Sequence, residues 1–590
     1  MRFFSTLIAS VLGSFIAVGL VIFVGIMIMT VVVTSSVSIN EPSISSESVL
    51  VLSLTGPVEE QGTTDPLYDL LDIPQPQGLN RVRAALKSAA NDDRIQAVWV
   101  KPQGVIAGWS TLLEIRESLE DFKMSGKPLI ASSAGDFSMR ESDYFLASVA
   151  DSIFSAPNAF FEFNGFYLGV SFYKGLFDKL NVDPTILKVG SYKGGVEPYS
   201  REDMSDENRI QYSEILSNWN NLMTSTVAKA RGINQEDVID LIEMGTIMTT
   251  EDAYEHGLLD GLLQTEEIEA LLSDLIGSDD DLSTISLAKY SPSAMDQPTN
   301  SEGTIGLMTA SGTIISGQSN NLNGYLGAGS FQKSMKKFRD DDRVKAVVLR
   351  IDSPGGSATA SEAMWQSVNE TSQKKPVVVS MGDLAASGGY WLATAGDTII
   401  ASPHTITGSI GVYGVHFSLG RMLETKFGIT SDHVSTSEYA DMFSGMRPLR
   451  PSEQALFQRS LGDTYEKFLH RVSENRNMSI EDVHEVAQGR VWTGNLAFDA
   501  GLVDELGNLD DAIRIASDMA GLEEGSYRVK RLPEPETLLD QYLDLFLAHI
   551  RSFIESPIET QFRKEARLLE EAIKLQGIPI ARMPINIEYR

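Results

Sequence analysis

A serine surrounded by small residues lies in the second half of the chain, at Ser387 within residues 380–391 (SMGDLAASGGYW). A β-branched run precedes it and an apolar run of helix-like composition follows it, which predicts a strand, a tight turn and a helix. Such a turn would lift Ser387 out of a sheet and direct the backbone N–H of Gly388 at the group under attack. For this stretch alone, a flexible glycine-rich turn is the other interpretation.

The chain carries one pattern twice, and the repeat bears on that choice. Residues 91–98 (NDDRIQAV) reappear as 340–347 (DDDRVKAV), and residues 253–260 (AYEHGLLD) reappear as 497–504 (AFDAGLVD). The two separations, 249 and 244 residues, keep a register that chance would not keep. The sequence therefore predicts a duplicated domain, in which positions that differ between the copies point to chemistry.

Two chemically active residues each occur in only one copy. Ser387 aligns with Glu141, so the nucleophile is present only in the second copy. Lys193 aligns with Ala440, so the lysine is present only in the first copy. A serine hydroxyl becomes a strong nucleophile when a neighbouring base takes its proton, and a neutral lysine amine can be that base. The sequence thus predicts one composite Ser–Lys site built across the two domains.

The surroundings of Lys193 decide whether its amine is neutral. Burial in an apolar pocket lowers the pKa of a lysine, and Lys193 lies among Tyr192, two glycines and Val196. A facing carboxylate would instead keep the ammonium charged, so we expect Glu197 to point elsewhere. A solvated loop lysine is the alternative interpretation, and His404, which follows a proline shared by both copies, is the alternative base.

A catalytic serine also needs N–H donors for the oxyanion that forms during attack. Residues 349–356 (LRIDSPGG) read as a buried strand that ends in two glycines before a helix, so an N–H of Gly355 or Gly356 is expected to act with that of Gly388. A strand-to-helix turn alone would explain the glycines. It would not explain why the matching residues 100–104 (VKPQG) lack the pair.

Composition excludes several other classes of function. The 590-residue chain is longer than one core usually organises, which predicts two or more domains. Its net charge of −32 argues against nucleic acid as a partner. There is no cysteine, the seven histidines show no metal-ligand spacing, and no phosphate-binding loop motif is present. We therefore expect neither a metal nor another cofactor.

Alternating β-branched runs and amphipathic stretches predict the fold of each copy, an α/β domain with a mainly parallel sheet covered by helices. We expect two tandem domains, at residues 45–277 and 303–530, joined by an Asp-, Ser- and Pro-rich linker over 278–302. Residues 531–590 match neither copy. Apolar residues at helical spacing over 538–554 predict a helical tail that packs on the globular body or, alternatively, docks on a membrane surface.

The N-terminal residues 1–40 predict a membrane anchor. Residues 15–33 are almost continuously apolar, which is enough to cross a bilayer. The run is longer than a signal-peptide core and lacks a convincing cleavage motif, which favours an uncleaved anchor. Arg2 precedes the run and acidic residues follow it, so the positive-inside rule predicts that the bulk of the chain lies outside the cytoplasm.

Four stretches together resemble the signal peptide peptidase A (protease IV) family in its long, duplicated form. They are residues 350–356, 381–391, 407–411 (TGSIG) and 192–198 (YKGGVEP). With the anchor and the repeat, the resemblance reaches to about residue 507. It implies a Clp protease/crotonase-like fold in each half and a membrane-anchored serine endopeptidase with a Ser–Lys dyad.

The resemblance also implies roles for individual residues. Ser387 would be the nucleophile, Lys193 the general base, and Ser409 the residue that orients the lysine amine. The glycines Gly194 and Gly195 depart from the family, in which bulkier small residues are common at these positions.

For the whole protein, the resemblance implies peptide substrates, namely released signal peptides that are cut within their apolar cores. It implies a bowl-shaped homotetramer at the bacterial inner (cytoplasmic) membrane, with one transmembrane segment and the catalytic domains on the periplasmic side. Two other functions fit parts of the sequence. One is a catalytically silent scaffold that binds membrane proteins, and the other is a crotonase-like acyl-CoA enzyme.

Overall fold

The computed structural model describes most of both copies and one short piece of the tail. The predicted anchor at residues 1–40 and the helix predicted over 538–554 lie outside the described residues. Within the described part, no helix has the length and hydropathy needed to cross a membrane. The described residues are 44–62, 77–133, 135, 137–278, 282–290, 301–320, 324–534 and 580–583.

The first copy is built on a seven-stranded sheet in the order β2-β1-β3-β4-β5-β7, with β8 also paired to β1. Every pair in it is parallel, as βαβ units require. Its strands are β1 (Ser48–Glu59), β2 (Gln77–Gly78), β3 (Ile95–Ile106), β4 (Leu129–Ser133), β5 (Ser152–Ser155), β7 (Gly261–Leu262) and β8 (Thr284–Ser286). Its main helices are α3 (Leu79–Asn91), α4 (Trp109–Lys123), α5 (Glu141–Ala147), α8 (Asp206–Arg231), α9 (Gln235–Glu243), α10 (Thr250–Glu255) and α11 (Thr265–Ile276).

The second copy repeats this plan in an eight-stranded sheet in the order β18-β16-β14-β12-β9-β20, with β15 paired to β14 and β19 paired to β15. All its pairs are parallel except β16 with β18. Its strands are β9 (Gly303–Ser311), β12 (Val344–Ser353), β14 (Val377–Ala386), β15 (Thr398–Ala401), β16 (Ile406–Gly408), β18 (Val491–Thr493), β19 (Glu505–Leu506) and β20 (Tyr527–Leu532). Its main helices are α12 (Ala328–Asp340), α13 (Ala358–Ser372), α14 (Gly388–Ala393), α16 (Pro451–Arg476), α17 (Ile480–Val486), α18 (Gly494–Asp499) and α19 (Leu509–Met519).

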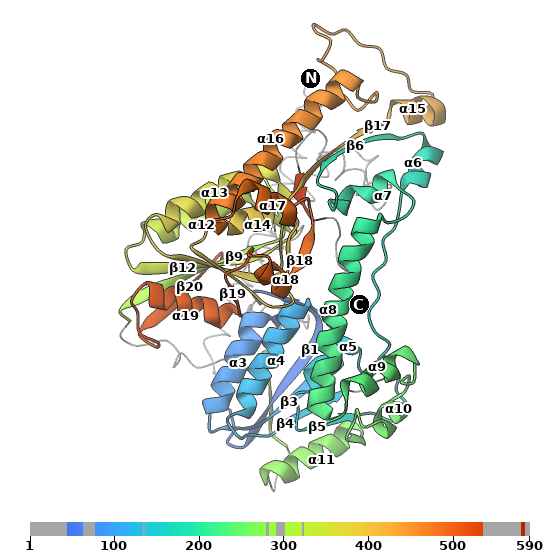
Figure 1. Cartoon of the computed structure of the whole chain (residues 1–590). Helices are drawn as coiled ribbons and strands as arrows, with labels where there is room; N and C mark the ends of the chain where they lie inside the picture. The colour runs from blue at the N-terminus through green and yellow to red at the C-terminus, as the bar shows by residue number, and fades with distance from the viewer. Residues whose placement is uncertain are drawn as a thin grey trace, which may run out of the picture.

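The two copies stack on one another (Figure 1) and repeat individual side-chain contacts. The buried hydroxyl of Tyr144 donates to the carbonyl of Leu258 at 2.7 Å, and that of Tyr390 donates to Leu502 at 2.8 Å. Each copy also has an equivalent last strand, which pairs with its first long strand. Residues 284–286, which were expected in the linker, form β8 against β1, just as β20 lies against β9. The duplication of the α/β fold therefore extends to individual hydrogen bonds and strand pairings.

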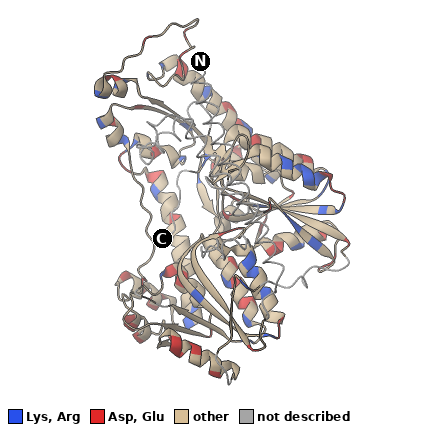
Figure 2. Cartoon of the chain, turned by 180° about the vertical axis from the view of Figure 1, so that it is seen from behind, with Lys and Arg blue, Asp and Glu red and all other residues tan. Residues whose placement is uncertain are grey.

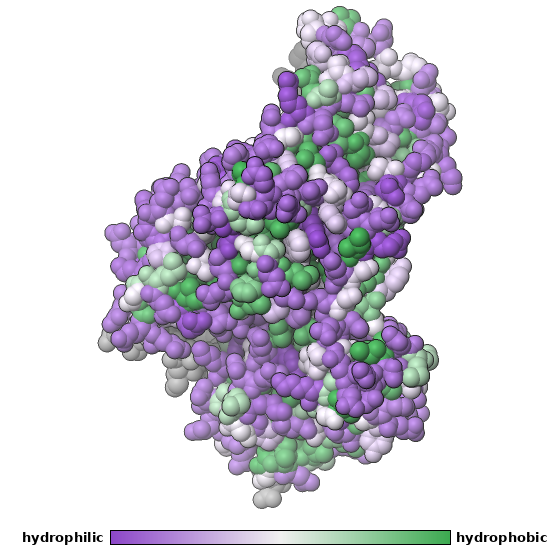
Figure 3. Space-filling model, viewed as in Figure 1, coloured by the Kyte–Doolittle hydropathy of each residue, from purple (hydrophilic) through white to green (hydrophobic). Residues whose placement is uncertain are grey.

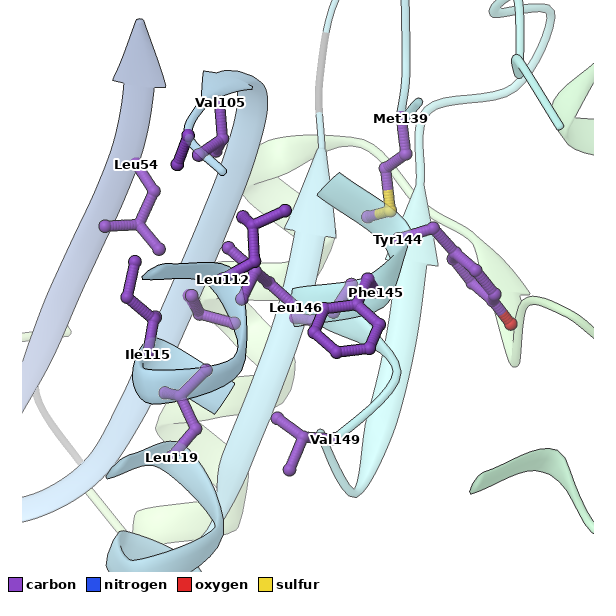
Figure 4. Close-up of a cluster of buried hydrophobic side chains, with 14 of the residues drawn as sticks. Leu54, Val105, Leu112, Ile115, Leu119, Met139, Tyr144, Phe145, Leu146 and Val149 are labelled. Carbon is purple, nitrogen blue, oxygen red and sulfur yellow. The ribbon is translucent and has the colours of Figure 1, made fainter. Parts of the chain in front are cut away.

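Apolar side chains lie in the core and charged side chains lie outside it, as a layered α/β fold requires. The core of the first copy contains Leu112, Ile115 and Leu119 of α4, all fully or almost fully buried (Figure 4). Charged residues lie mainly on helices and loops, while the strands are mostly uncharged (Figure 2). The face shown in Figure 3 is accordingly mainly hydrophilic.

A third sheet joins three parts of the chain, and the sequence did not predict it. Its order is β11-β10-β13-β21-β17-β6, with antiparallel pairs at β13–β21, β21–β17 and β17–β6. Residues 580–582 are extended here, where a helical tail was expected. The strands are β6 (Asp183–Val189) of the first copy, β10 (Thr313–Ile315), β11 (Tyr325–Gly327), β13 (Gly355–Ser357) and β17 (Val412–Ser418) of the second, and β21 (Ile580–Arg582) of the tail.

The long β6–β17 pair carries the first copy toward the second. All seven residues of β6 pair with β17, from Asp183 opposite Ser418 to Val189 opposite Val412. The two strands run side by side at the upper right of Figure 1, beside α6 (Lys174–Leu180) and α7 (Glu197–Ser200). Because Lys193 follows β6 by four residues, this pairing brings the lysine of the first copy into the second.

Candidate active site

Ser387 lies in the predicted strand–turn–helix, between the end of β14 and the start of α14. Its backbone has φ 56° and ψ −111°, a strained conformation that non-glycine residues rarely adopt and that is found at sharp turns holding a nucleophile. The Ser387 N–H donates to the Gly408 carbonyl at 2.8 Å, and the Ser387 carbonyl accepts from the Trp391 N–H at 2.8 Å. Bonds on both sides therefore hold the strained turn in place.

Lys193 reaches Ser387 from the other copy. Its Nζ lies 2.8 Å from the Ser387 hydroxyl oxygen, and it is 2.9 Å from both the backbone and the side-chain oxygen of Ser409. All three side chains are fully buried. The structure thus brings the serine of the second copy and the lysine of the first copy together within one chain. Ser409 is the third member of the group.

Burial sets the protonation of this lysine. Desolvation lowers the pKa of Lys193 well below its ordinary value of 10.5. Glu197, as expected, points elsewhere: its carboxylate accepts from the Ser205 N–H at 3.1 Å and lies 3.8 Å from the Lys188 amine. An amine in this position favours its neutral form, which is the form that can accept a proton.

The predicted oxyanion donors meet beside Ser387. A Cβ built on Gly355, whose φ is 89°, would lie 2.5 Å from the amide nitrogen of Gly388, so only glycine fits there. The Gly355 N–H also donates to the Ser353 hydroxyl at 3.2 Å. A Cβ on Gly356 would lie 2.0 Å from the Ile314 carbonyl oxygen of β10, so this glycine permits strand pairing. The structure therefore packs Gly355 against the amide of Gly388, with Gly356 next to it on β13.

The alternative base lies in other contacts. The Nδ1 atom of His404 is 2.6 Å from the amide oxygen of Asn218 on α8. Burial lowers the pKa of His404 to about 4. It is Lys193, not His404, that contacts the serine hydroxyl. In the described part of the chain, no group of three or more His, Asp or Glu side chains is arranged to hold a metal ion.

The loop before β18 holds both halves of the site and was missed by sequence reasoning. The Gln488 carbonyl accepts from the Tyr192 N–H at 2.9 Å, and the Arg490 carbonyl accepts from the Ser409 N–H at 2.7 Å. A Cβ on Gly489 would lie 2.7 Å from the backbone nitrogen of Lys193. The available signal was this isolated glycine just before a short strand, a position where glycine often marks close backbone approach.

Gly194 lets the lysine loop approach α8 closely. A Cβ on Gly194 would lie 2.0 Å from the side-chain nitrogen of Asn208 on α8. Asn208 in turn contacts Gln211, whose side-chain oxygen accepts from the Val491 N–H at 3.0 Å. The glycine therefore lets the lysine loop pack tightly against a buried polar network that reaches β18.

A carboxylate latch joins the strand of the nucleophile to the first copy. Asp383 lies four residues before Ser387 on β14, and its carboxylate accepts from the Gly108 N–H at 3.0 Å and from the Thr111 N–H at 2.8 Å. The Thr111 hydroxyl donates to the same group at 2.7 Å. Gly108 at the N-cap of α4 has no capping side chain, so Asp383 caps that helix from the other copy.

A buried ion cluster extends the same interface. Arg350 on β12 is almost fully buried and pairs with Glu60 at 2.8 Å and Glu114 at 2.6 Å, both from the first copy. Desolvation, together with the nearby carboxylates of Asp383 and Glu60, raises the pKa of Asp352 to about 8. Asp352 is therefore mainly protonated at neutral pH, which limits the negative charge beside Arg350.

Comparison with known proteins finds the same duplication in the sequence. The model of peptidase family S49 matches residues 121–277 and 369–523, once in each copy, and the Clp protease model matches residues 328–407. Protease 4 of Salmonella typhi is 31% identical over 556 residues, which cover 91% of this chain and 88% of the relative.

Two further relatives also match most of the chain. Protease 4 of Haemophilus influenzae is 34% identical over 523 residues, covering 85% of this chain and 84% of the relative. The chloroplastic serine protease SPPA of Arabidopsis thaliana is 33% identical over 482 residues, covering 80% and 69%. The similarity therefore spans both copies rather than one.

Proposed function

Because the chain belongs to peptidase family S49 and is a serine peptidase, we propose that it is an endopeptidase with Ser387 as nucleophile and Lys193 as general base, both from one chain. The observation that carries the proposal is the 2.8 Å contact between a buried lysine amine and the hydroxyl of a strained serine. Neither the silent scaffold nor the acyl-CoA enzyme needs such a pair.

The three oxygens around Lys193 match the valence of a neutral amine, which has two N–H groups and one lone pair. The two Ser409 oxygens take the N–H groups. The lone pair then points at the Ser387 hydroxyl and takes its proton as the oxygen attacks a peptide carbonyl. Ser409 is in this way the positioning residue that keeps the amine aimed at the serine.

Attack produces a tetrahedral oxyanion that needs N–H donors. The amide of Gly388, with that of Gly355 or Gly356, is proposed to supply them beside the serine. The Lys193 ammonium returns its proton to the leaving amine, which yields an acyl ester on Ser387 and a free amino end. Water, deprotonated by the same amine, then attacks the ester, releases the carboxylate and restores the serine hydroxyl.

For the cellular setting we propose the arrangement that the sequence predicts. The apolar run within residues 1–40 anchors the chain in the bacterial inner membrane, with both copies on the periplasmic side and four chains in the assembly. Released signal peptides, cut within their apolar cores, are the proposed substrates. The support is the family membership, the apolar run and the motifs shared with the signal peptide peptidase A family.

The test is cleavage of an apolar fluorogenic peptide by the full chain in detergent. Ser387→Ala is expected to lower kcat by at least about 10⁴-fold, as removal of a catalytic serine does. An acylating probe directed at serine should label Ser387 in the unmodified chain and leave the variant unlabelled. Cleavage retained by Ser387→Ala, or absence of labelling in the unmodified chain, would contradict the proposal and favour the silent scaffold.

A further inference from the structure

Arg490 lies where three parts of the chain meet beside the candidate active site, and it directly precedes β18. Its guanidinium carbon lies 5.5 Å from the centre of the Tyr192 ring and 4.0 Å from the centre of the Trp492 ring. Its Nη2 atom donates to both carboxylate oxygens of Glu214 on α8, at 3.0 and 2.9 Å. One side chain therefore contacts the loop of Lys193, the helix α8 of the first copy and the strand β18 of the second copy.

The backbone of the same residue holds the group that orients the lysine amine. The Arg490 carbonyl accepts from the Ser409 N–H at 2.7 Å. Ser409 has φ 52°, a left-handed conformation that non-glycine residues rarely adopt, so this bond helps to keep a strained residue in place. Both oxygens of Ser409 lie 2.9 Å from the Lys193 amine. A shift of residue 490 would therefore reach the amine through Ser409.

The residue before Arg490 packs on the lysine itself. A Cβ on Gly489 would lie 2.7 Å from both the backbone nitrogen and the Cβ of Lys193. The Gly489 N–H donates to the Ile410 carbonyl at 2.7 Å, which ties the loop to the second copy. Lys193 is fully buried, and burial is what lowers its pKa. A loop that packs this closely on the lysine helps to keep water away from the amine.

The first copy has no residue of this kind. The segments that align, again with a separation of 244, are 245–249 (GTIMT) and 489–493 (GRVWT). Thr246 therefore stands opposite Arg490, and Met248 stands opposite Trp492. Met248 is 55% exposed, whereas Trp492 is half-buried and lies against the guanidinium. Like the nucleophile and the base, Arg490 is present in only one copy.

The surroundings of the guanidinium argue against a purely stabilising role. The side chains of Arg490 and Glu214 are 24% and 37% exposed, and ion pairs in such positions contribute little to stability. Within the described part of the chain, the buried Nε atom of Arg490 has no hydrogen-bond acceptor, which costs stability. The contacts of this side chain are better explained by the segments that it holds together.

We propose that Arg490 is a positioning residue of the peptidase, which keeps Lys193 and Ser409 in the arrangement that aims the amine at the nucleophile. This rests on the proposed function, in which Lys193 is the base. The planar group matters because a guanidinium can lie over aromatic rings while its edge pairs with a carboxylate, whereas an ammonium is a point charge. No described hydrogen bond or ring contact of Arg490 goes to the serine, so it acts through the amine.

The charged groups on the segments around the lysine are paired with one another. On its own segment, the Glu197 carboxylate lies 3.8 Å from the Lys188 amine. On α8 and in the loop before β18, Glu214 and Arg490 form the pair described above. Exclusion of water is therefore the control that loss of Arg490 would disturb. Water that reaches the amine raises the pKa of Lys193 toward its ordinary value, and more of the amine is then protonated at neutral pH.

The experiment measures kcat, KM and Tm of the full chain in detergent, with the apolar fluorogenic peptide, at pH 7 and at pH 9. Arg490→Met should lower kcat at pH 7 by about 10–100-fold, as displacement of a reacting group by about 1 Å does. KM should stay within about twofold, because KM reports binding of a peptide that Arg490 does not contact in this proposal. At pH 9 the loss should be at least about threefold smaller, because an amine with a raised pKa is again neutral there.

Two matched variants separate positioning from stability. Arg490→Lys keeps the charge but not the plane, so kcat at pH 7 should fall by about 3–10-fold, again less at pH 9. Arg476→Met removes an arginine that pairs with Asp504 at 2.7 Å, beside the start of β15 and at the end of the sheet opposite Ser387. This control should lower Tm and leave kcat unchanged at both pH values.

A double variant tests whether charge alone explains the result. Arg490→Met leaves the Glu214 carboxylate without its partner, and a free carboxylate could by itself raise the pKa of Lys193. The double variant with Glu214→Gln carries neither charge. It should show the same loss of kcat and the same dependence on pH as Arg490→Met. Recovery of full kcat in the double variant would overturn the proposal.

The remaining outcomes also decide the matter. If either Arg490→Met or Arg490→Lys keeps full kcat at pH 7, the inference is wrong and the proposed function stands. If the loss is equal at pH 7 and pH 9, Arg490 does not act through the amine and the inference is again wrong. If the unmodified chain neither cuts the peptide nor is labelled at Ser387, it is the proposed function that fails.

Discussion

The two copies use the same strand–turn–helix for opposite purposes. In the first copy, Glu141 begins α5, and its buried carboxylate accepts from the N–H groups of Asn164 and Gly165 at 2.7 and 2.8 Å. In the second copy, Ser387 stands at the start of α14, and its hydroxyl faces Lys193. The first copy therefore closes its turn with its own acid, while the second keeps a nucleophile pointed at a base.

The donors at the end of the neighbouring strand differ in the same way. In the first copy, the N–H groups of Gly104 and Val105 donate to the carboxylate of Asp143, both at 2.9 Å. Asp143 aligns with Gly389, so the second copy has no carboxylate there, and the Gly355 N–H donates instead to the Ser353 hydroxyl at 3.2 Å. The first copy cannot offer these N–H groups to a substrate. Its remaining contribution to the site is to supply Lys193, which follows β6.

This division of labour makes Lys193→Met the variant with the largest expected effect. Without the base, kcat for the apolar fluorogenic peptide should fall by at least about 10⁴-fold. Burial lowers the pKa of Lys193 in the folded chain well below the 10.5 of an ordinary lysine, so the folded chain binds this proton less well than the unfolded chain does and burial of the lysine lowers stability below pH 10.5. We expect Tm at pH 7 to rise by about 2–4 °C, and the gain to shrink as the pH approaches 10.5.

Two control variants sharpen this prediction. Lys179→Met, on the exposed surface of α6, should leave both kcat and Tm unchanged. Adding Ala440→Lys to the Lys193→Ala chain should restore nothing, because Ala440 is exposed and its loop lies outside the site. Rescue by that change would show that the copies are interchangeable, and it would contradict the asymmetry argued above.

Ser409→Ala tests how far the second copy must orient the lysine of the first. The variant removes one of two oxygens that hold the Lys193 amine and leaves the Ser409 carbonyl in place. The amine becomes a charged ammonium as it takes the serine proton, and a hydrogen bond to a charged group contributes about 1.5–3 kcal/mol, so kcat should fall by about 10–100-fold. Because the described hydrogen bonds of Ser409 go to Lys193 and Arg490, KM should stay within about twofold. A change in KM alone would contradict the positioning role.

Asp383→Ala tests whether the latch between the copies serves the site or only the fold. Loss of a helix cap costs about 1–2 kcal/mol, and the free energy of unfolding in urea should fall by that amount. Because Asp383 fixes β14 close to Ser387, we also expect kcat to fall by about 3–10-fold. The matched control is Ser479→Ala, which removes the cap of α17 within the second copy alone. If both variants lose stability equally and both keep full kcat, the latch is purely structural.

Local pattern and comparison of the copies were enough to predict the mainly parallel sheet of each copy and to pair Ser387 with Lys193. The parts that could not be predicted depend on contacts between distant segments. Asp383 caps a helix whose N-cap residue, Gly108, lies 275 residues earlier in the chain. A capping residue can be recognised in a sequence only when it directly precedes its own helix. The strand β21 is only three residues long, too short for a periodic pattern, and its partners β13 and β17 lie more than 150 residues earlier in the chain.

The smallest expected effect concerns pH at the interface between the copies. Asp352 has a folded-state pKa of about 8 against an ordinary 3.8, because of burial and the facing carboxylates of Asp383 and Glu60, which Arg350 only partly offsets. Between about pH 4 and pH 8 the folded chain holds a proton there that the unfolded chain has released, so this group lowers the free energy of unfolding as the pH rises. Above pH 8 its contribution no longer changes.

Asp352→Asn mimics the protonated carboxyl and keeps an oxygen for the Leu384 N–H, which donates to Asp352 at 3.0 Å. Relative to the unmodified chain, the variant should gain stability progressively from pH 5 to pH 8, measured by urea unfolding at each pH, with kcat changed by less than about threefold. The first copy has Gln103 at the matching position, an amide that cannot ionise. A stability difference that stays constant across this range would show that Asp352 is ionised in the folded chain, and that the carboxylates of the interface do not repel one another as their geometry indicates.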